Sequence, residues 1–381
     1  MLTNADIAEL TALRRELHRF PDVSREEGPT AARIVAALAP LSPDQLMTGL
    51  GGHGVAAVFQ GAAPGPTVLF RAELDALPIA ELSDAPHRST LPGKGHLCGH
   101  DGHMTLLIAL ARLLSRQRPA RGRVVLMFQP AEEDGSGAAA VTADPAFAAI
   151  RPDWAFAIHN LPGVPFGQAR LAPGVVNCAS QGLKITLQGK TAHASQPETG
   201  ISPAGALSRL IPALTALGPG GALAPGYRLV TVTHARLGAP AFGIAPGEAE
   251  LWVTLRTLED AAMAALRDAA TTLAETAATA DGLTLALTTH DDFAASVNHP
   301  EATARVAAAL DALAIPHSAA DLPMRASEDF GRFGAAPTRS AMLFLGAGDI
   351  PALHNPDYDF PDDLIPLGAR IFHHIARDLL I

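Results

Sequence analysis

The chain has 381 residues, of which 48% are hydrophobic and 17% are charged, and its formal net charge is -10. A chain of this length usually needs more than one hydrophobic core, so two domains are expected. The negative net charge and the lack of a lysine and arginine cluster argue against a nucleic-acid partner. The N-terminal region lacks the features of a signal peptide and no apolar run is long enough to span a bilayer, so we expect a cytoplasmic protein without a membrane partner.

The N-terminal half alternates helical and strand patterns. Apolar side chains recur at helical spacing in three segments, which we expect to form helices: residues 7–20, about 30–38 and 104–114. Four short apolar runs are typical of strands, the last two of buried ones: residues 55–59, 67–71, 124–128 and 154–158. This alternation predicts an α/β domain with a sheet covered on both faces.

The segment from about Cys178 to His290 has a different order of elements, β-α-β-β-α-β, which is the ferredoxin-like arrangement of a small domain. After it, a helix over 300–313, a strand over 341–345 and a helix over 366–380 are predicted. We therefore expect a two-domain, sheet-centred α/β architecture. One domain comprises residues 1–177 and 291–381, and a ferredoxin-like domain is inserted at 178–290.

The segment His96-Leu-Cys-Gly-His-Asp-Gly-His103 gathers potential metal ligands in what we expect to be a loop before a helix. A thiolate and an imidazole separated by one glycine, as in Cys98 and His100, can face one metal ion if the loop is tight. A helix-capping loop with incidental histidines is the alternative. Three histidines with a cysteine and an aspartate favour the metal site.

Adjacent carboxylates follow the predicted strand 124–128, where Pro130 ends the strand and places Glu132 and Glu133 on a loop. Ligand sites in open α/β sheets gather at the carboxyl ends of strands. One carboxylate of such a pair can bind a metal while the other moves protons. A solvated acidic turn would explain this motif equally well.

Other strand ends carry His159, His354 and the acidic pair Glu73 and Asp75. Each of these residues taken alone is more commonly structural. Histidine, cysteine and carboxylate groups are thus predicted near the ends of several independent strands, and this favours one shared site.

Seven motifs together resemble the aminoacylase/carboxypeptidase family of two-metal peptidases, most closely its hippurate hydrolase and auxin–amino acid conjugate hydrolase branch: RAELDALPI, GHLCGHDGH, FQPAEED, AIHNLPG, GKTAHASQPETGISP, ASEDF and LHNPDYDFPDD. They occur in the family's order, and the resemblance covers nearly the whole chain. It implies metal-dependent hydrolysis of the amide bond of N-acyl amino acids, hippurate-like or N-acetylated. A dipeptidase, a carboxypeptidase or a carbamoyl-type amidohydrolase would use the same site. A non-catalytic metal-binding scaffold is a further alternative, against which an intact Glu132 argues.

The resemblance also implies roles for individual residues. Five side chains would hold two divalent metal ions per chain, with the Cys98 thiolate bridging them: Cys98, His100, Glu133, His159 and His354. Zinc or manganese suits these ligand types, and cobalt is a third option. Glu132 would be the general acid/base, and Asp75 would orient a ligand. Glu73 stands where other branches place a metal-binding histidine, and it is not counted as a ligand here.

In the inserted domain, the resemblance implies that His193 stabilises the oxyanion and contacts the substrate in the active site of a partner subunit. It also implies that Arg256 contacts a substrate carboxylate. Because a histidine acting across subunits requires a dimer, we expect a homodimer. Relatives often carry an asparagine where this chain has Gly243, a departure that concerns substrate specificity more than chemistry.

Overall fold

The computed structural model describes residues Met1–Ile381 and divides into two compact units. Unit 1 comprises Met1–Val176, Ser296–Leu322 and Asp329–Ile381, and unit 2 comprises Asn177–Ala295 and Pro323–Glu328. The sequence predicted an inserted domain of residues 178–290, but unit 2 extends from Asn177 to Ala295 and also includes the short segment Pro323–Glu328. This segment belongs to unit 2 because the Cys178 N–H, at the start of that unit's sheet, donates to the carbonyls of Met324 and Ala326.

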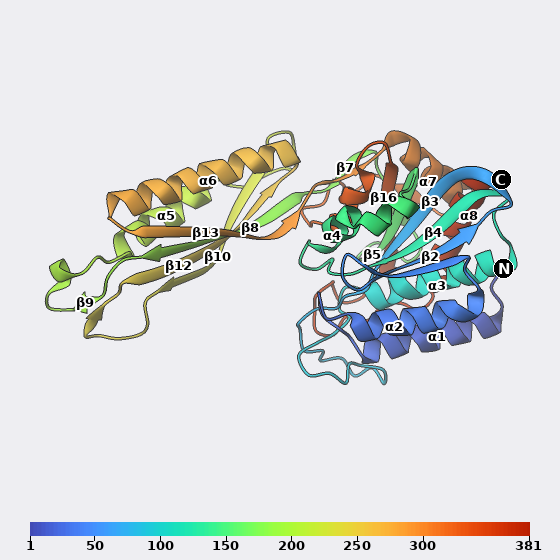
Figure 1. The fold of residues 1–381 in the computed structure, drawn as a ribbon, viewed down its shortest axis with the longest axis horizontal. Helices are drawn as coiled ribbons and strands as arrows, with labels where there is room; N and C mark the ends of the chain where they lie inside the picture. The colour runs from blue at the N-terminus through green and yellow to red at the C-terminus, as the bar shows by residue number, and fades with distance from the viewer. The chain divides into compact units, whose positions relative to one another are not determined.

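Unit 1 contains an eight-stranded mixed sheet in the order β1-β2-β4-β3-β5-β16-β6-β15 (Figure 1). Its strands are β1 (Gln45–Leu50), β2 (Gly54–Gln60), β3 (Ala63–Glu73), β4 (Arg121–Gln129), β5 (Trp154–Pro162), β6 (Ala169–Arg170), β15 (His317–Ser318) and β16 (Arg339–Gly348). The four central strands, β4, β3, β5 and β16, are parallel neighbours, so their carboxyl ends meet at one edge of the sheet. Two short strands, β7 (Gly174–Asn177) and β14 (Ser296–Asn298), form a separate pair.

Five long helices pack into one hydrophobic core with this sheet: α1 (Asn4–Arg19), α2 (Gly28–Leu38), α3 (His100–Arg116), α7 (Pro300–Ala312) and α8 (Leu364–Leu380). Because side chains alternate across a strand, residues such as Val68, Phe70 and Ala72 of β3 enter this core while Arg71 points to the opposite face. The shorter helix α4 (Gly137–Ala143) packs against the 3-10 turn Asp329–Gly334. The predicted helices and buried strands are all present. The partly exposed edge strand β1 was not predicted.

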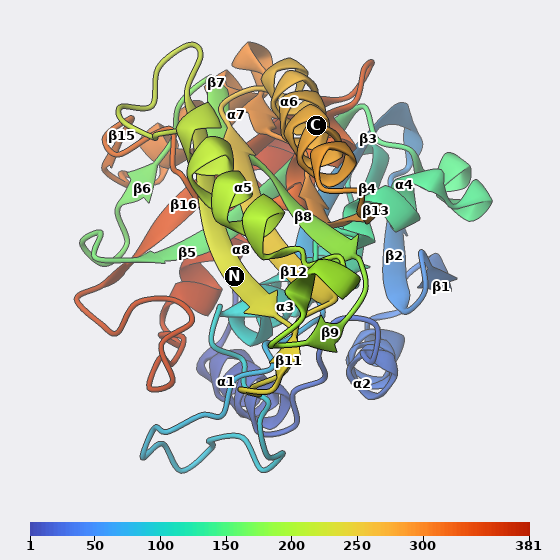
Figure 2. The same ribbon diagram turned by 90° about the vertical axis from the view of Figure 1, so that its left-hand side faces the viewer.

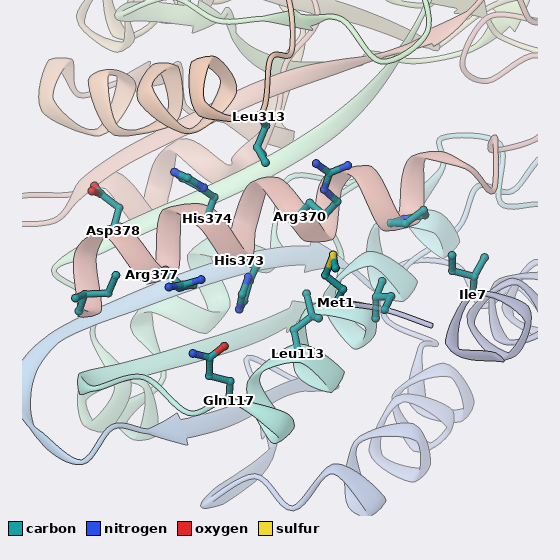
Figure 3. A pocket seen from close by; sticks show the side chains of 13 residues that line it. Met1, Ile7, Leu113, Gln117, Leu313, Arg370, His373, His374, Arg377 and Asp378 are labelled. Atoms are coloured by element: carbon teal, nitrogen blue, oxygen red, sulfur yellow. The ribbon is translucent and has the colours of Figure 1, made fainter. Parts of the chain in front are cut away.

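The exposed side of α8 borders a groove of about 890 Å³ (Figure 3). Leu113 of α3 and Leu313 contribute apolar side chains, and Arg370 and Arg377 extend from α8. None of the candidate metal ligands lines this groove. It is therefore a feature of the surface distinct from the site described below.

Unit 2 is a four-stranded antiparallel sheet in the order β10-β12-β8-β13, with two helices on one face (Figures 1 and 2). Its elements follow the predicted β-α-β-β-α-β order: β8 (Ala179–Gln188), α5 (Ala204–Leu217), β10 (Arg228–Leu237), β12 (Glu248–Thr257), α6 (Asp260–Ala280) and β13 (Thr284–Phe293). A two-residue pair, β9 (Ala192–His193) with β11 (Ile244–Ala245), lies outside this sheet. Apolar side chains of α5, α6 and the sheet form a second core, separate from that of unit 1. Nowhere in either unit is a helix both long enough and apolar enough for a transmembrane span.

Candidate metal centre

Apart from Cys98 and His100, which lie just before and at the start of α3, the candidate site residues of unit 1 lie at or after the carboxyl ends of its parallel strands. Asp75 follows β3, Glu132 and Glu133 follow β4, His159 lies in β5, and His354 follows β16. Each of these strands contains a buried apolar run, and the polar site residues lie at or beyond its carboxyl end. The sheet therefore delivers side chains that are far apart in the sequence to one place, as expected for an open α/β fold.

Residues 96–103 were expected to form a loop before a helix, but α3 begins within this segment, at His100. Gly99 makes this early start possible by adopting a left-handed conformation with φ of +97° between Cys98 and His100. A Cβ at this position would overlap the side-chain amide of Asn160 and the hydroxyl of Tyr358. Glycine is thus required both by the backbone conformation and by the space available.

Two groups of potential ligands share the buried thiol of Cys98. Cys98, His100 and His159 form one group, and Cys98, Glu133 and His354 form the other, with ligand atoms in each group within 4.8 Å of one another. The Cys98 Sγ lies 3.5 Å from His159 Nε2, and His354 Nε2 lies 3.7 Å from Glu133 Oε2. A residue common to two adjacent ligand groups has the position that a bridging ligand requires.

Hydrogen bonds to the other ring nitrogen orient two of the histidines. His100 Nδ1–H donates to the carbonyl of Asp75 at 2.8 Å, and its Nε2 is buried without a hydrogen-bond partner. His159 Nδ1–H donates to its neighbouring carbonyl, that of Asn160, at 2.7 Å, which leaves Nε2 directed at Cys98. This is the arrangement in which imidazole binds metal, with one nitrogen fixed by a backbone acceptor and the other available.

His100 and His159 have different electrostatic surroundings. Burial alone would lower the pKa of His100, but the carboxylates of Glu73 and Glu133 outweigh it and raise that pKa. Burial, with His103 nearby, lowers the pKa of His159 to about 3, so this ring is neutral and available as a ligand. A carboxylate-rich environment at an unpartnered His100 Nε2 favours a cation at that atom. The residues present therefore fit a divalent metal pair.

The turn after β4 is fixed by Asp75. Its Oδ2 accepts the Glu133 N–H at 2.9 Å and the Ser24 hydroxyl at 2.7 Å. Glu132 and Glu133 each place a carboxylate oxygen 3.8 Å from His100 Nε2. Glu132 is absent from both groups that contain Cys98, although its carboxylate lies within 4.8 Å of ligand atoms of His100 and Glu133.

A buried network beneath the ligands was not predicted in detail. His103 Nδ1–H donates to Glu73 at 2.7 Å, and His103 Nε2 accepts the Asn160 N–H at 3.1 Å. Asn160 in turn donates to the carbonyl of Cys98 at 2.8 Å and accepts the Tyr358 hydroxyl at 2.6 Å. Glu73 also pairs with the buried Arg71. Glu73 thus interacts with Arg71 and His103, and its carboxylate also lies within 4.8 Å of ligand atoms of His100 and His103.

The two candidate residues of unit 2 have contacts within that unit. His193 lies in β9, is exposed, and its Nδ1 accepts the Ser195 N–H at 3.1 Å. Arg256 lies in β12 and donates to the Ser327 hydroxyl at 2.8 Å and to the carbonyl of Arg325 at 3.0 Å. Burial lowers the pKa of Arg256.

Comparison with known proteins gives matches along nearly the entire chain. The family model described as peptidase family M20/M25/M40 matches residues 69–378. IAA-amino acid hydrolase ILR1-like 5 from Arabidopsis thaliana is 28% identical over 387 residues, covering 98% of this chain and 87% of that protein. N-acetyl-L-cysteine deacetylase from Bacillus subtilis (strain 168) is 37% identical over 211 residues, covering 54% of this chain and 49% of that protein.

Among solved structures, the Bacillus subtilis YXEP protein, a dinuclear metal binding peptidase from the M20 family, matches with a TM-score of 0.82. The match covers 100% of this chain and 99% of that chain, at 24% sequence identity. At this identity the similarity concerns the fold.

Proposed function

Since this chain belongs to peptidase family M20/M25/M40 and is a metal-dependent hydrolase, we propose that it cleaves the amide bond of N-acyl amino acids, releasing a carboxylic acid and a free amino acid. One observation carries the proposal: two ligand groups share Cys98, and the carboxylate of Glu132, which belongs to neither of these two groups, lies beside them. The relatives named above include an IAA-amino acid hydrolase and an N-acetyl-L-cysteine deacetylase, which supports an acyl amino acid as substrate.

The five proposed ligands would hold two divalent cations: Cys98, His100, Glu133, His159 and His354. When bound, such a pair polarises a carbonyl group and makes water more acidic. The thiolate favours zinc, and the histidine and carboxylate ligands also suit manganese.

Glu132 is proposed to carry the proton. Its carboxylate takes a proton from the attacking water and delivers it to the nitrogen of the leaving amine. The Asp75 carboxylate accepts the Glu133 N–H, and the Asp75 carbonyl accepts the His100 Nδ1–H. Asp75 therefore keeps Glu133 and His100, the two residues beside Glu132, in position. In unit 2, His193 is proposed to stabilise the oxyanion across a homodimer, and Arg256 to bind the substrate carboxylate.

The test is a comparison of Glu132→Gln with Glu133→Gln. The first variant should keep the metal content of the wild type and lose about a hundredfold to ten-thousandfold in kcat, since general acid–base catalysis contributes that much. The second should lose bound metal. Wild-type turnover in Glu132→Gln would refute the assignment.

The substrate class is tested with hippurate, N-acetyl amino acids and dipeptides, each with and without a chelator. Chelator-sensitive release of the acyl group supports an acyl amino acid hydrolase. Cleavage of dipeptides alone would instead make the protein a dipeptidase.

A further inference from the structure

Glu27 is a fully buried carboxylate near the metal centre to which no role has been assigned above. It lies immediately before α2, with an exposed fraction of 0%, and it is not among the potential metal ligands. Its Oε1 accepts the N–H of Ala131 at 2.8 Å and the N–H of Arg25 at 2.9 Å. A single oxygen atom thus joins the N-terminal segment to the turn that carries Glu132 and Glu133.

Both donors have an unusual backbone conformation. Arg25 has φ of +70° and Ala131 has φ of +48°, although neither residue is glycine. A left-handed conformation is unfavourable for a residue with a Cβ, and it persists where the surroundings impose it. Both left-handed residues direct their N–H groups at the same Glu27 oxygen atom, and these hydrogen bonds favour the conformation.

The segment that carries Glu27 is itself well anchored. The Asp22 carboxylate accepts both the N–H and the hydroxyl of Thr30, and the Asp22 carbonyl accepts the N–H of Ala76 just after β3. Ser24 adds a hydrogen bond to Asp75. Glu27 therefore projects from a rigid support.

Downstream of Ala131, the turn after β4 is held by the hydrogen bond from the Glu133 N–H to Asp75 and by the ion pair of Asp134 with Arg25. Gly137 N–H donates to the Ala131 carbonyl, and Gly135 N–H donates to the Glu132 carbonyl, both at 2.8 Å. The Ala131 N–H is buried and has Glu27 as its acceptor. Removing that acceptor leaves a buried donor unsatisfied at a strained residue, a combination that favours rotation of the backbone directly before Glu132.

We propose that Glu27 is a positioning residue whose buried oxygen holds the Pro130–Glu133 turn in the conformation that directs Glu132 to the substrate. The proposal rests on the function proposed above for Glu132. The second oxygen, Oε2, has no hydrogen-bond partner, so the position of one acceptor atom is what matters. The carboxylate charge is not required for this role.

Three substitutions separate the position of the oxygen from its charge. Glu27→Gln keeps an acceptor at the same reach, Glu27→Asp keeps the charge but withdraws the oxygen, and Glu27→Ala removes both. Asp144→Ala is the matched control, because the Asp144 carboxylate also accepts two backbone N–H groups, those of Gly51 and Ala146. Neither of these backbone groups belongs to the turn after β4.

The experiment measures kcat and KM for hippurate, metal content, and hydrogen exchange of the Ala131 amide before and after chelation. Glu27→Asp and Glu27→Ala should lower kcat about tenfold or more with unchanged KM, since small misplacements of catalytic groups have effects of this size. They should also accelerate exchange at Ala131. Glu27→Gln and Asp144→Ala should resemble the wild type in both respects.

Unchanged exchange at Ala131 in Glu27→Asp and Glu27→Ala would overturn the proposal, as would a Glu27→Gln variant as impaired as Glu27→Ala. If the wild type cleaves no amide, the proposed function fails. The exchange measurement still decides whether Glu27 holds the turn, because it does not depend on activity.

Discussion

Replacing Gly99 with alanine should destabilise unit 1 and weaken metal binding together. The backbone contributes the first part of the cost, because φ of +97° is unfavourable for alanine by about 1–2 kcal/mol. The added Cβ contributes the second, because it overlaps Asn160 and Tyr358, and overpacking of this kind costs about 1–3 kcal/mol. The free energy of unfolding should therefore fall by about 2–5 kcal/mol.

Gly163→Ala provides the matched control. Gly163 has a similar φ of +83°, but a Cβ there would meet no atom within 4 Å. Its cost should be limited to the backbone part, about 1–2 kcal/mol. The assay is urea unfolding of the metal-free proteins, followed by titration with zinc.

The two variants should also differ in metal affinity. The overlap in Gly99→Ala displaces Asn160, which donates to the carbonyl of Cys98, so that variant should bind zinc more weakly than Gly163→Ala. Equal unfolding free energies for the two variants would refute the steric reasoning. Equal zinc affinities would refute the link between Gly99 and the ligand loop.

Two further predictions concern buried ion pairs. Burial opposes protonation of His18, but Asp101 and Glu81 together raise its pKa to about 10. Since the folded pKa lies above the unfolded value, its stabilisation is complete below about pH 6.5 and is lost as the pH rises toward 10. His18→Gln should therefore cost about 3–5 kcal/mol near pH 6 and progressively less by pH 10 in urea unfolding, and a pH-independent cost would contradict this. Arg71→Met should also cost about 3–5 kcal/mol near neutral pH, because it removes the buried cation with which both Glu73 and Asp329 pair. A variant as stable as the wild type would show that these carboxylates do not depend on Arg71.

Much of the fold was predictable because hydrophobic periodicity reports local structure. The buried strands of unit 1 are continuous apolar runs, and unit 2 follows the expected order of elements. The match to peptidase family M20/M25/M40 confirms the resemblance stated from the motifs. Edge strand β1 was missed because its apolar and polar residues do not alternate and all but one of its side chains are exposed or half-buried.

The features that were missed depend on contacts between distant residues. Glycine at position 99 suggested a loop, but α3 begins directly after it, and a Cβ there would overlap Asn160 and Tyr358, which are distant in sequence. Segment 323–328 belongs to unit 2 because of hydrogen bonds to Cys178, which no local pattern shows. The roles proposed for His193 and Arg256 remain predictions from the resemblance.

The stoichiometry of bound metal tests the central claim most directly. Because Cys98 belongs to both ligand groups, while His159 and His354 each belong to one, an alanine at Cys98 should cost more bound metal than an alanine at either histidine. Elemental analysis after loading with zinc and desalting should find about two ions per chain in the wild type, about one in His159→Ala or His354→Ala, and fewer than one in Cys98→Ala. A wild-type chain that retains no zinc, or a Cys98→Ala variant that still retains both ions, would contradict the shared two-metal centre.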